Sequence, residues 1–573
     1  MPQPSITEVH TPQSCCRFAL AWTDITPPAG IYHRMWGAAK HERATGVHRP
    51  LRATVAVFAP IEGGESAQTA HPLPLRNERG EGRPPSAVLL RRTGGEGHPD
   101  SDTPAQPQTR RPSSPQPSLP SAGGEGEETG TLNPYSERER APEGRVRGRP
   151  PEQRQILLAL DHCVLGAVEH EQLIAHVAQA SELPKDAILV VFSHTHGAGL
   201  MGLERASLPG GELIPGYLRS VAGRAAELVR ECVARLAPVG IVYGEGCCRL
   251  AAHRDFFDEG RKQFVCGFNP GASADDTVLV ARVTADDGKL LATVVNYACH
   301  PTTLAWDNTL ISPDYVGAMR ELIEQATGAP CLFLQGASGD LGPREGYVGD
   351  TAVADRNGRE LGFAALSALT ALPAAGTVFR YTGAVVSGAT LGGWAHEPLK
   401  AGEVERKGKW QLWRWRELLP YRPGQPTADQ AEAALKQFQI DEENARAAGD
   451  MERAADCRSM AERKRRLLHR LSQLPRGGSF PLQVVLWRMG DAFWLGVQGE
   501  SYSVLQTELR RRFPGTPILV ASIAADWGAS YLPPAPLYES GIYQESIAIV
   551  AAGSLEQLIE SVAARITAAG KSS

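Results

Sequence analysis

Short apolar runs, each bounded by glycine, proline or polar residues, recur along the chain and predict buried β-strands. Single runs of this kind occupy residues 53–58, 155–160, 187–192 and 330–334. Two further pairs of runs are joined by glycine-containing turns, at 287–288 and at 490–491, and each pair predicts a β-hairpin. We expect the strands 53–58 and 155–160 to lie in one sheet.

Segments with helical spacing alternate with these strands. They cover 215–236 and 554–567, and another helix is expected to begin near Ser312, whose hydroxyl would cap it ahead of a proline and an aspartate. Residues 427–474 are charged, rich in alanine and free of proline, and they predict a helical hairpin that breaks near Gly449. We interpret this hairpin as a solvated arm without chemistry. The whole pattern predicts an α/β protein, with a mixed β-sheet core and flanking helices.

One long segment breaks the pattern. Residues 62–150 are rich in Pro, Gly, Ser, Glu and Arg, and Tyr135 is their only aromatic residue. Such a composition buries too little apolar area to offset the entropy of ordering, so we predict a disordered insertion. The residues 1–61 and 151–573 are then two parts of one catalytic α/β domain, and the arm lies within the second part.

Composition and charge exclude several classes of protein. The chain has 42% hydrophobic and 21% charged residues and a net charge of −5, with no basic stripe that would favour nucleic acid. No apolar run approaches the length of about 20 residues that a transmembrane helix needs. The start lacks the features of a signal peptide, and the ten cysteines include no Cys-x-x-Cys motif. We therefore expect a cytoplasmic protein.

The candidate chemistry lies at the ends of predicted strands. His194 and His196 follow the run 187–192, and the alternation of strand side chains would direct both to one side of the strand's tip. The return strands of the two predicted hairpins lead to His300 and Glu500. Imidazole and carboxylate are common zinc ligands, so the sequence predicts that these segments share a metal ion.

Five motifs in this order resemble those of the neutral/alkaline (non-lysosomal) ceramidases. They occupy residues 194–197, 296–301, 339–343, 499–500 and 528–533. The opening segment 24–28 is also similar to the first strand and turn of that family. The resemblance extends over nearly the whole chain outside the insertion. Since the chain ends soon after the last motif, the family's C-terminal immunoglobulin-like domain is expected to be absent.

The resemblance implies one zinc ion in the catalytic domain. Carried over motif by motif, the ligands would be His194, His300, Glu500 and Tyr531. The assignment of Tyr531 is supported by a second tyrosine, Tyr543, at the family's offset of twelve residues.

The resemblance also assigns residues to the substrate. His196 and Tyr543 would hold the substrate carbonyl and its developing oxyanion, and Arg254 would orient the substrate. Asp340, in the 339–343 motif, joins this catalytic set, although an ion pair with Arg344 is the alternative for it.

One position departs from the family pattern. Ceramidases carry a serine directly before the proline of Gly-Asp-x-Ser-Pro, and this chain has Gly342 there. Glycine has no side chain to act as a nucleophile. Ser338, four residues earlier, is not the same position. We therefore expect attack by metal-activated water, with His196 as the proton donor to the leaving group.

Two functions remain open at this point. The first is a zinc-dependent amidohydrolase that cleaves an amide or ester bond in a small-molecule or lipid-like substrate, such as an N-acyl sugar or an N-acyl amino acid. The second is a catalytically silent metal-binding relative that acts as a binding or scaffold protein, which the missing serine favours. Secretion is the family-based alternative to a cytoplasmic location. The oligomeric state is left open.

Overall fold

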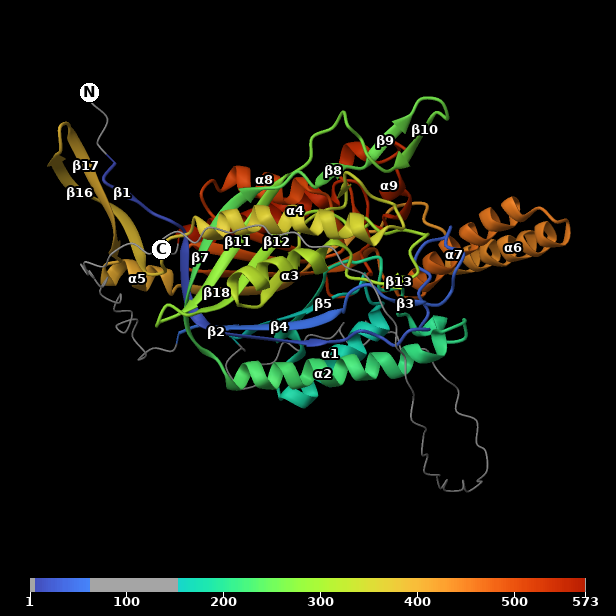
Figure 1. The fold of residues 1–573 in the computed structure, drawn as a ribbon. Coiled ribbons are helices and arrows are strands. Elements are labelled where there is room, and N and C mark those ends of the chain that lie inside the picture. Colours follow the sequence, from blue (N-terminus) through green and yellow to red (C-terminus); the bar gives the residue numbers. More distant parts are fainter. Residues whose placement is uncertain (1–5, 62–152, 572–573) are drawn as a thin grey trace, which may run out of the picture. The chain divides into compact units, whose positions relative to one another are not determined.

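The protein is described here by a computed structural model that covers residues 6–61 and 153–571 (Figure 1). The predicted insertion at 62–150 lies outside the described residues, so its order stays a prediction. Among the described residues, no helix combines the length and the apolar character that crossing a bilayer requires.

The core is a mixed sheet of twelve strands, which confirms the predicted fold class. In spatial order its strands are β14 (Cys331–Gln335), β12 (Leu290–Tyr297), β11 (Thr277–Ala285), β7 (Ala237–Cys247), β2 (Gln13–Asp24), β4 (Arg52–Ala59), β5 (Gln155–Leu160), β6 (Ile188–Phe192), β22 (Ile518–Ala524), β20 (Ala492–Gln498), β19 (Ser479–Met489) and β18 (Trp410–Pro420). The pairs β12–β14, β5–β6 and β20–β22 are parallel, and the other pairs are antiparallel. The predicted neighbours 53–58 and 155–160 are indeed adjacent, as β4 and β5.

The two halves of this sheet face each other. The Phe58 ring on β4 lies 5.0 Å from the Trp494 ring on β20. The Asn296 amide on β12 donates to the Val520 carbonyl on β22 at 2.7 Å. Apolar side chains from both halves form one buried cluster between them. This packing brings strand ends that are distant in sequence to the same edge of the core.

Smaller sheets and ten helices in the described chain surround the core. One small sheet has three strands, β1 (Glu8–Val9), β16 (Thr377–Val386) and β17 (Thr390–Pro398). The other small sheets have two strands each: β9 (Asp255–Asp258) with β10 (Gln263–Cys266), β3 (Gly46–Val47) with β13 (Leu310–Ile311), β8 (Ala251–His253) with β15 (Leu341–Pro343), and β21 (Glu500–Ser501) with β23 (Tyr531–Leu532). The helices are α1 (Ala167–Ser181), α2 (Ile214–Ala234), α3 (Tyr315–Thr327), α4 (Thr351–Thr370), α5 (Ala401–Lys407), α6 (Ala428–Ala447), α7 (Met451–Gln473), α8 (Val504–Arg512), α9 (Tyr543–Ile547) and α10 (Ser554–Lys571).

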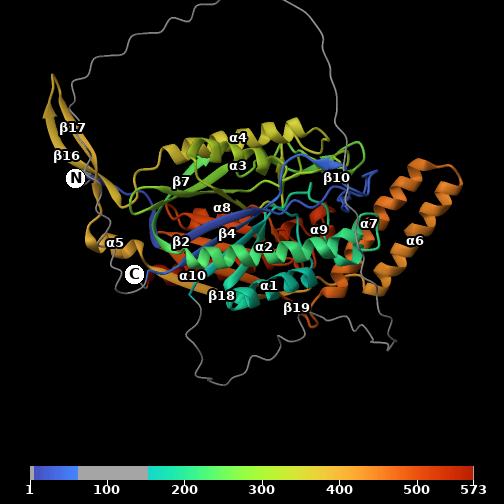
Figure 2. The same ribbon diagram turned by 60° about the horizontal axis from the view of Figure 1, so that its bottom comes forward.

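The helices cover the outer faces of the sheet. Figures 1 and 2 show α3 and α4 on the side opposite α1 and α2. Helices α1 and α2 share an apolar cluster with β4, β5 and β6, and α3 and α4 share one with β11, β12 and β14. Helices α8 and α10 pack on β19, β20 and β22. Burial on both faces explains why these strands appear in the sequence as continuous apolar runs.

The predicted helical hairpin is present as α6 and α7, which lie side by side (Figures 1 and 2). The break is at Gly449, whose φ of 75° places it in the left-handed region that glycine adopts without strain. The prediction of a hairpin is confirmed.

Two local predictions need correction. The N-cap of α3 is Asp314, whose carboxylate accepts from the Tyr315 amide at 2.6 Å, and Ser312 lies two residues earlier. The Ser312 hydroxyl instead accepts from the Asp314 amide. In addition, β6 ends at Phe192, and His194 has a φ of 65°. Strand alternation therefore does not orient His194 and His196, because both lie in the loop that follows the strand.

Candidate metal centre and active site

Three strand ends of the core deliver the predicted ligands. His194 follows β6, His300 follows β12, and Glu500 follows β20 as the first residue of β21. Strand β21 pairs in parallel with β23, so that Glu500 lies opposite Tyr531. Segments separated by long stretches of sequence thus meet at one edge of a rigid sheet, which is an effective way to preorganise a site.

The side chains of these residues converge. The Glu500 Oε2 atom lies 3.1 Å from His300 Nε2 and 3.4 Å from His194 Nε2. One ligand atom each from His194, His300 and Glu500 can be chosen so that all lie within 4.8 Å of one another. The Tyr531 Oη atom lies 3.4 Å from His300 Nε2. The structure therefore brings the four predicted ligands together.

Backbone carbonyls fix the orientation of both histidines. Nδ1–H of His194 donates to the Cys163 carbonyl at 2.8 Å, and Nδ1–H of His300 donates to the Ser338 carbonyl at 2.7 Å. These bonds leave both Nε2 atoms directed at Glu500. Metal-binding histidines are commonly oriented in this way by a partner on the other ring nitrogen. Buried His194 Nε2 has no hydrogen bond, and two imidazoles with one carboxylate suit zinc.

Burial and mutual charge set the protonation of this cluster. Burial and the nearby Arg254 lower the pKa of His300 to about 3. For His194, burial opposes the charged form, but Cys163 and Glu500 outweigh it and raise the pKa to about 10. Burial also opposes the Glu500 carboxylate, yet the two imidazoles hold its pKa well below the usual value. The carboxylate is thus ionised, and a cation can replace the proton on His194.

The predicted substrate-binding residues line the same space. The His196 ring lies 5.0 Å from the His194 ring and 6.0 Å from the His300 ring, and its buried Nε2 has no hydrogen bond. Burial and both neighbouring imidazoles hold the pKa of His196 well below its usual value. Tyr543 is 44% exposed, and its ring lies 5.9 Å from that of Tyr531.

Arg254 is buried beside the predicted ligand Tyr531. Its guanidinium donates to the Gly339 carbonyl at 2.7 Å and to the Tyr531 hydroxyl at 3.1 Å. It therefore contacts both the 339–343 loop and a predicted ligand.

The remaining predicted site residue, Asp340, lies apart from the cavity. The Asp340 carboxylate accepts from the amide and the hydroxyl of Ser503, at 2.7 and 2.6 Å, and is not among the residues that line the cavity. The alternative ion pair between Asp340 and Arg344 is not formed, since Arg344 instead lies 3.9 Å from Glu360. Asp340 anchors the loop to the start of α8.

Space exists at Gly342 for a side chain. A Cβ atom there would lie 3.7 Å from Thr302 Oγ1 and 3.8 Å from Arg254 Cδ, which is ordinary van der Waals contact. The nearby Ser338 is buried, and its hydroxyl accepts a hydrogen bond from Gln335 at 2.7 Å.

A cavity of about 570 Å³ opens onto this cluster. Its lining includes His194, His196, Arg254, Glu500, Tyr531 and Tyr543. It also includes residues that the sequence reasoning missed: Trp36, Trp306 and Tyr347 from loops, and Glu462, Arg463, Lys464, Arg466 and Arg470 from α7. The cationic run 463–466 was the available signal, but we interpreted the arm as solvated.

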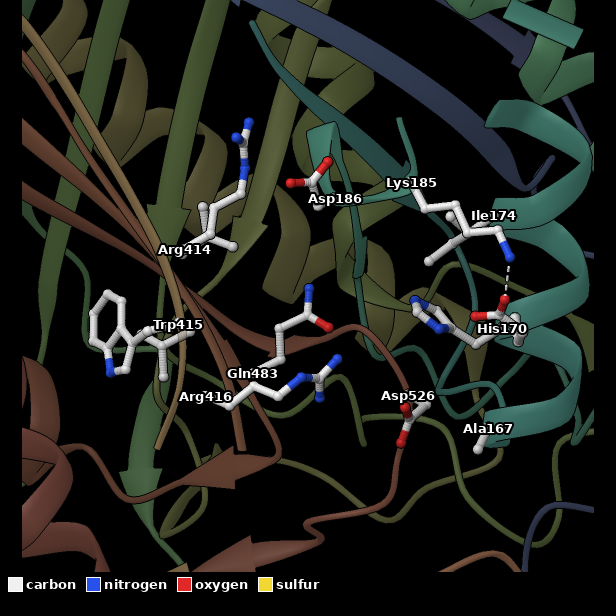
Figure 3. Close-up of a pocket in the computed structure, with 13 residues that line it drawn as sticks. Ala167, His170, Ile174, Lys185, Asp186, Arg414, Trp415, Arg416, Gln483 and Asp526 are labelled. Carbon is white, nitrogen blue, oxygen red and sulfur yellow. Dashed lines mark hydrogen bonds and ion pairs between the residues drawn. The ribbon is translucent and has the colours of Figure 1, made fainter. Parts of the chain in front are cut away.

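A second cavity, of about 540 Å³, lies elsewhere in the described chain (Figure 3). Figure 3 shows it between α1, which carries His170 and Ile174, and β18, which carries Arg414 and Trp415. None of the groups of His, Cys, Asp and Glu side chains that could hold a metal contributes to its lining. The first cavity is therefore the better candidate for the active site.

Comparisons with known proteins agree with this geometry at the level of the fold. No protein-family model and no curated protein sequence matches the chain. Solved structures do match it, and two of them are ceramidases. One is the neutral ceramidase from Pseudomonas aeruginosa, with 14% sequence identity and a TM-score of 0.54 over 97% of this chain and 74% of that one. This chain has a ceramidase-like fold. The other structure, a ceramidase complexed with C2, gives a TM-score of 0.55 at the same identity and coverage.

At this identity the likeness concerns the fold and does not assign roles to residues. The expected resemblance is thus confirmed for the architecture of the described chain. The roles of the ligand and substrate residues stay predictions.

Proposed function

We propose that this protein is a zinc-dependent hydrolase that cleaves an amide or ester bond. The observation that carries the proposal is the convergence of His194 Nε2, His300 Nε2 and Glu500 Oε2 beside a cavity that His194 and Glu500 line. The ceramidase-like fold supports the same class of reaction. When bound, zinc would polarise the substrate carbonyl and lower the pKa of a water molecule to about 7.

We assign metal binding and proton transfer to separate residues. His194, His300, Glu500 and Tyr531 would hold the metal. Neutral His196, with its unpaired Nε2 in the cavity, is placed to hydrogen-bond the carbonyl oxygen and to pass a proton to the leaving group.

Three further residues support this arrangement. Tyr543 would add a second hydrogen bond to the developing oxyanion. Arg254 acts on Tyr531, to which it donates a hydrogen bond, and keeps that phenol directed at His300. Asp340 is assigned a positioning role, since its carboxylate is engaged by Ser503.

The proposal is tested by metal content and turnover together. Purified protein should contain close to one zinc per chain, and a chelator should abolish hydrolysis in a screen of amides and esters. His300→Ala and Glu500→Gln should each lower kcat/KM by at least about a hundredfold and reduce bound zinc, because each removes a ligand.

Ser338→Ala is the matched control. It keeps the carbonyl that orients His300, so it should bind zinc normally and retain turnover. Full turnover by the metal-free protein would contradict the proposal.

A second candidate function is that of a catalytically silent metal-binding protein. Gly342, at the position of the family's serine, is the observation that favours it. Stoichiometric zinc without turnover of any amide or ester in the screen would identify this case.

A further inference from the structure

The cavity at the candidate metal centre has an excess of positive charge. Five cationic side chains line it, namely Arg254, Arg463, Lys464, Arg466 and Arg470. Only two carboxylates do so, Glu462 and Glu500, and both are already engaged. Glu500 contacts the two histidines, and Glu462 pairs with Arg205, Arg465 and Arg466. A bound divalent cation would increase the imbalance.

Arg470 is the least compensated of these charges. It is 5% exposed, its Nε atom has no hydrogen bond, and it makes no ion pair with any described carboxylate. Its guanidinium donates to the Ser530 hydroxyl at 3.1 Å and lies over the Trp527 ring at 5.2 Å. A buried guanidinium without a carboxylate is costly, and an anionic ligand removes that cost.

Two neighbouring cationic side chains of α7, Arg463 and Lys464, line the same side of the cavity as Arg470. Lys464 lines the cavity without an ion pair to any carboxylate in the described chain. Arg463 donates to Ser546 at 2.8 Å, just beyond Tyr543 on α9, and also pairs with no described carboxylate. Positive charge therefore follows α7 along one side of the cavity.

Another part of the lining is aromatic. The Trp306 ring lies 6.2 Å from the Trp36 ring and stacks on the Tyr347 ring at 6.3 Å. Trp36 also contacts the His196 ring at 5.2 Å. These rings suit an apolar group of a ligand, and the cationic side chains of α7 suit a negatively charged hydrogen-bond acceptor.

We propose that the substrate is an amide that carries an anionic group, a carboxylate or a phosphate, seated against Arg470 and Lys464. Its apolar part lies on Trp36, Trp306 and Tyr347. This inference rests on the proposed hydrolase function, and it names the substrate class of that same site.

Matched substrate pairs test the inference. The first pair is an N-acyl amino acid and its carboxamide, and the second is an N-acyl phosphoethanolamine and the N-acyl ethanolamine. Within each pair the scissile amide is the same and only the anion differs. The anionic member of at least one pair should show a kcat/KM at least about tenfold higher, and the pair that responds identifies the anion.

Variants separate charge recognition from a structural role. Arg470→Met and Lys464→Met should lower the ratio of anionic to neutral kcat/KM towards one, whereas a merely structural role would lower both rates together. Arg453→Met is the control, because Arg453 is exposed on the first turn of the same helix and does not line the cavity. It should leave the ratio unchanged.

A binding measurement keeps the outcomes distinct. The four compounds are titrated against the zinc-loaded protein, and tryptophan fluorescence follows their binding. Anionic and neutral members that are cleaved or bound equally well would overturn the inference and leave the hydrolase proposal standing. Tighter binding of the anionic member without turnover would support anion recognition by Arg470 and Lys464 and contradict the hydrolase proposal.

Discussion

The two predicted histidine ligands are oriented by backbone carbonyls. His194 is oriented by Cys163 and His300 by Ser338. Sequence motifs pointed to both imidazoles, but they carry no information about a carbonyl partner, since every residue has one. The choice of nitrogen that faces the cavity is therefore visible only in the folded structure.

Gly342, where the resemblance to ceramidases would place a serine, also gives a test at this scale. Gly342 has an ordinary negative φ, and a Cβ atom fits there without a close contact. If water is the nucleophile, Gly342→Ser and Gly342→Ala should have similar kcat/KM values. Their free energies of unfolding should lie within about 1 kcal/mol of the parent, since neither change strains the backbone.

Steady-state kinetics on the best amide of the screen, with denaturant unfolding, would compare the two variants. A serine variant that exceeds the alanine variant by tenfold or more would show that a hydroxyl at this position takes part in the reaction. That result would contradict direct attack by water.

At the scale of elements, the arm shows the limit of pattern reasoning. The spacing of residues 427–474 predicted both helices and their break, because helix and turn propensities are local. The same charged spacing suits a solvated helix and a docked one equally well. On α7, Glu462 is 1% exposed and pairs with the buried Arg205 at 3.0 Å, so this helix is docked to the body.

This junction predicts a pH dependence of stability. Burial alone would raise the pKa of Glu462, but Arg466 and Arg205 lower it to about 2, against 4.5 for an unperturbed carboxyl. The folded pKa is depressed, so the stabilisation is present above pH 4.5 and is lost as the pH falls towards 2. Glu462→Gln should therefore lower the free energy of unfolding by about 3 kcal/mol at pH 7.

Urea unfolding at several pH values would measure the difference in free energy of unfolding between the parent and Glu462→Gln. This difference should become smaller as the pH falls below 4.5. Glu442→Gln is the matched control, since Glu442 forms only an i,i+4 pair with Arg446 on α6 and should change stability by about 0.5 kcal/mol or less. If the change in free energy of unfolding caused by Glu462→Gln did not depend on pH, that result would contradict the assigned ion pair.

At the scale of the whole molecule, the described chain forms one continuous sheet despite the long segment between β4 and β5. The two strands are antiparallel neighbours, with Phe58 opposite Gln155. A short connection can therefore join them, and the entropy of loop closure changes only slowly with length.

We predict that replacing residues 62–150 with a short Gly/Ser linker leaves the fold intact. The melting temperature should shift by only a few degrees and the zinc content should stay the same, because the strands that carry the ligands are unchanged. Calorimetry and metal analysis would measure both. Loss of cooperative unfolding, or loss of zinc, would show that the segment contributes to the fold or to the site.

The sequence by itself determined the local features of this protein. Apolar runs gave the strands, helical spacing gave the arm, and the residues His194, His300 and Glu500 supplied the chemical types of a zinc site. These features depend on neighbours in the chain, so a pattern can carry them.

Only the tertiary structure decided which of these features meet. The two halves of the sheet pack against each other, and this packing brings the predicted ligands His194 and His300 to Glu500. The tertiary structure also turned the cationic side of α7 towards the cavity, where Arg470 is buried without a carboxylate. These outcomes depend on packing between segments far apart in the chain, and local sequence does not encode the distances involved.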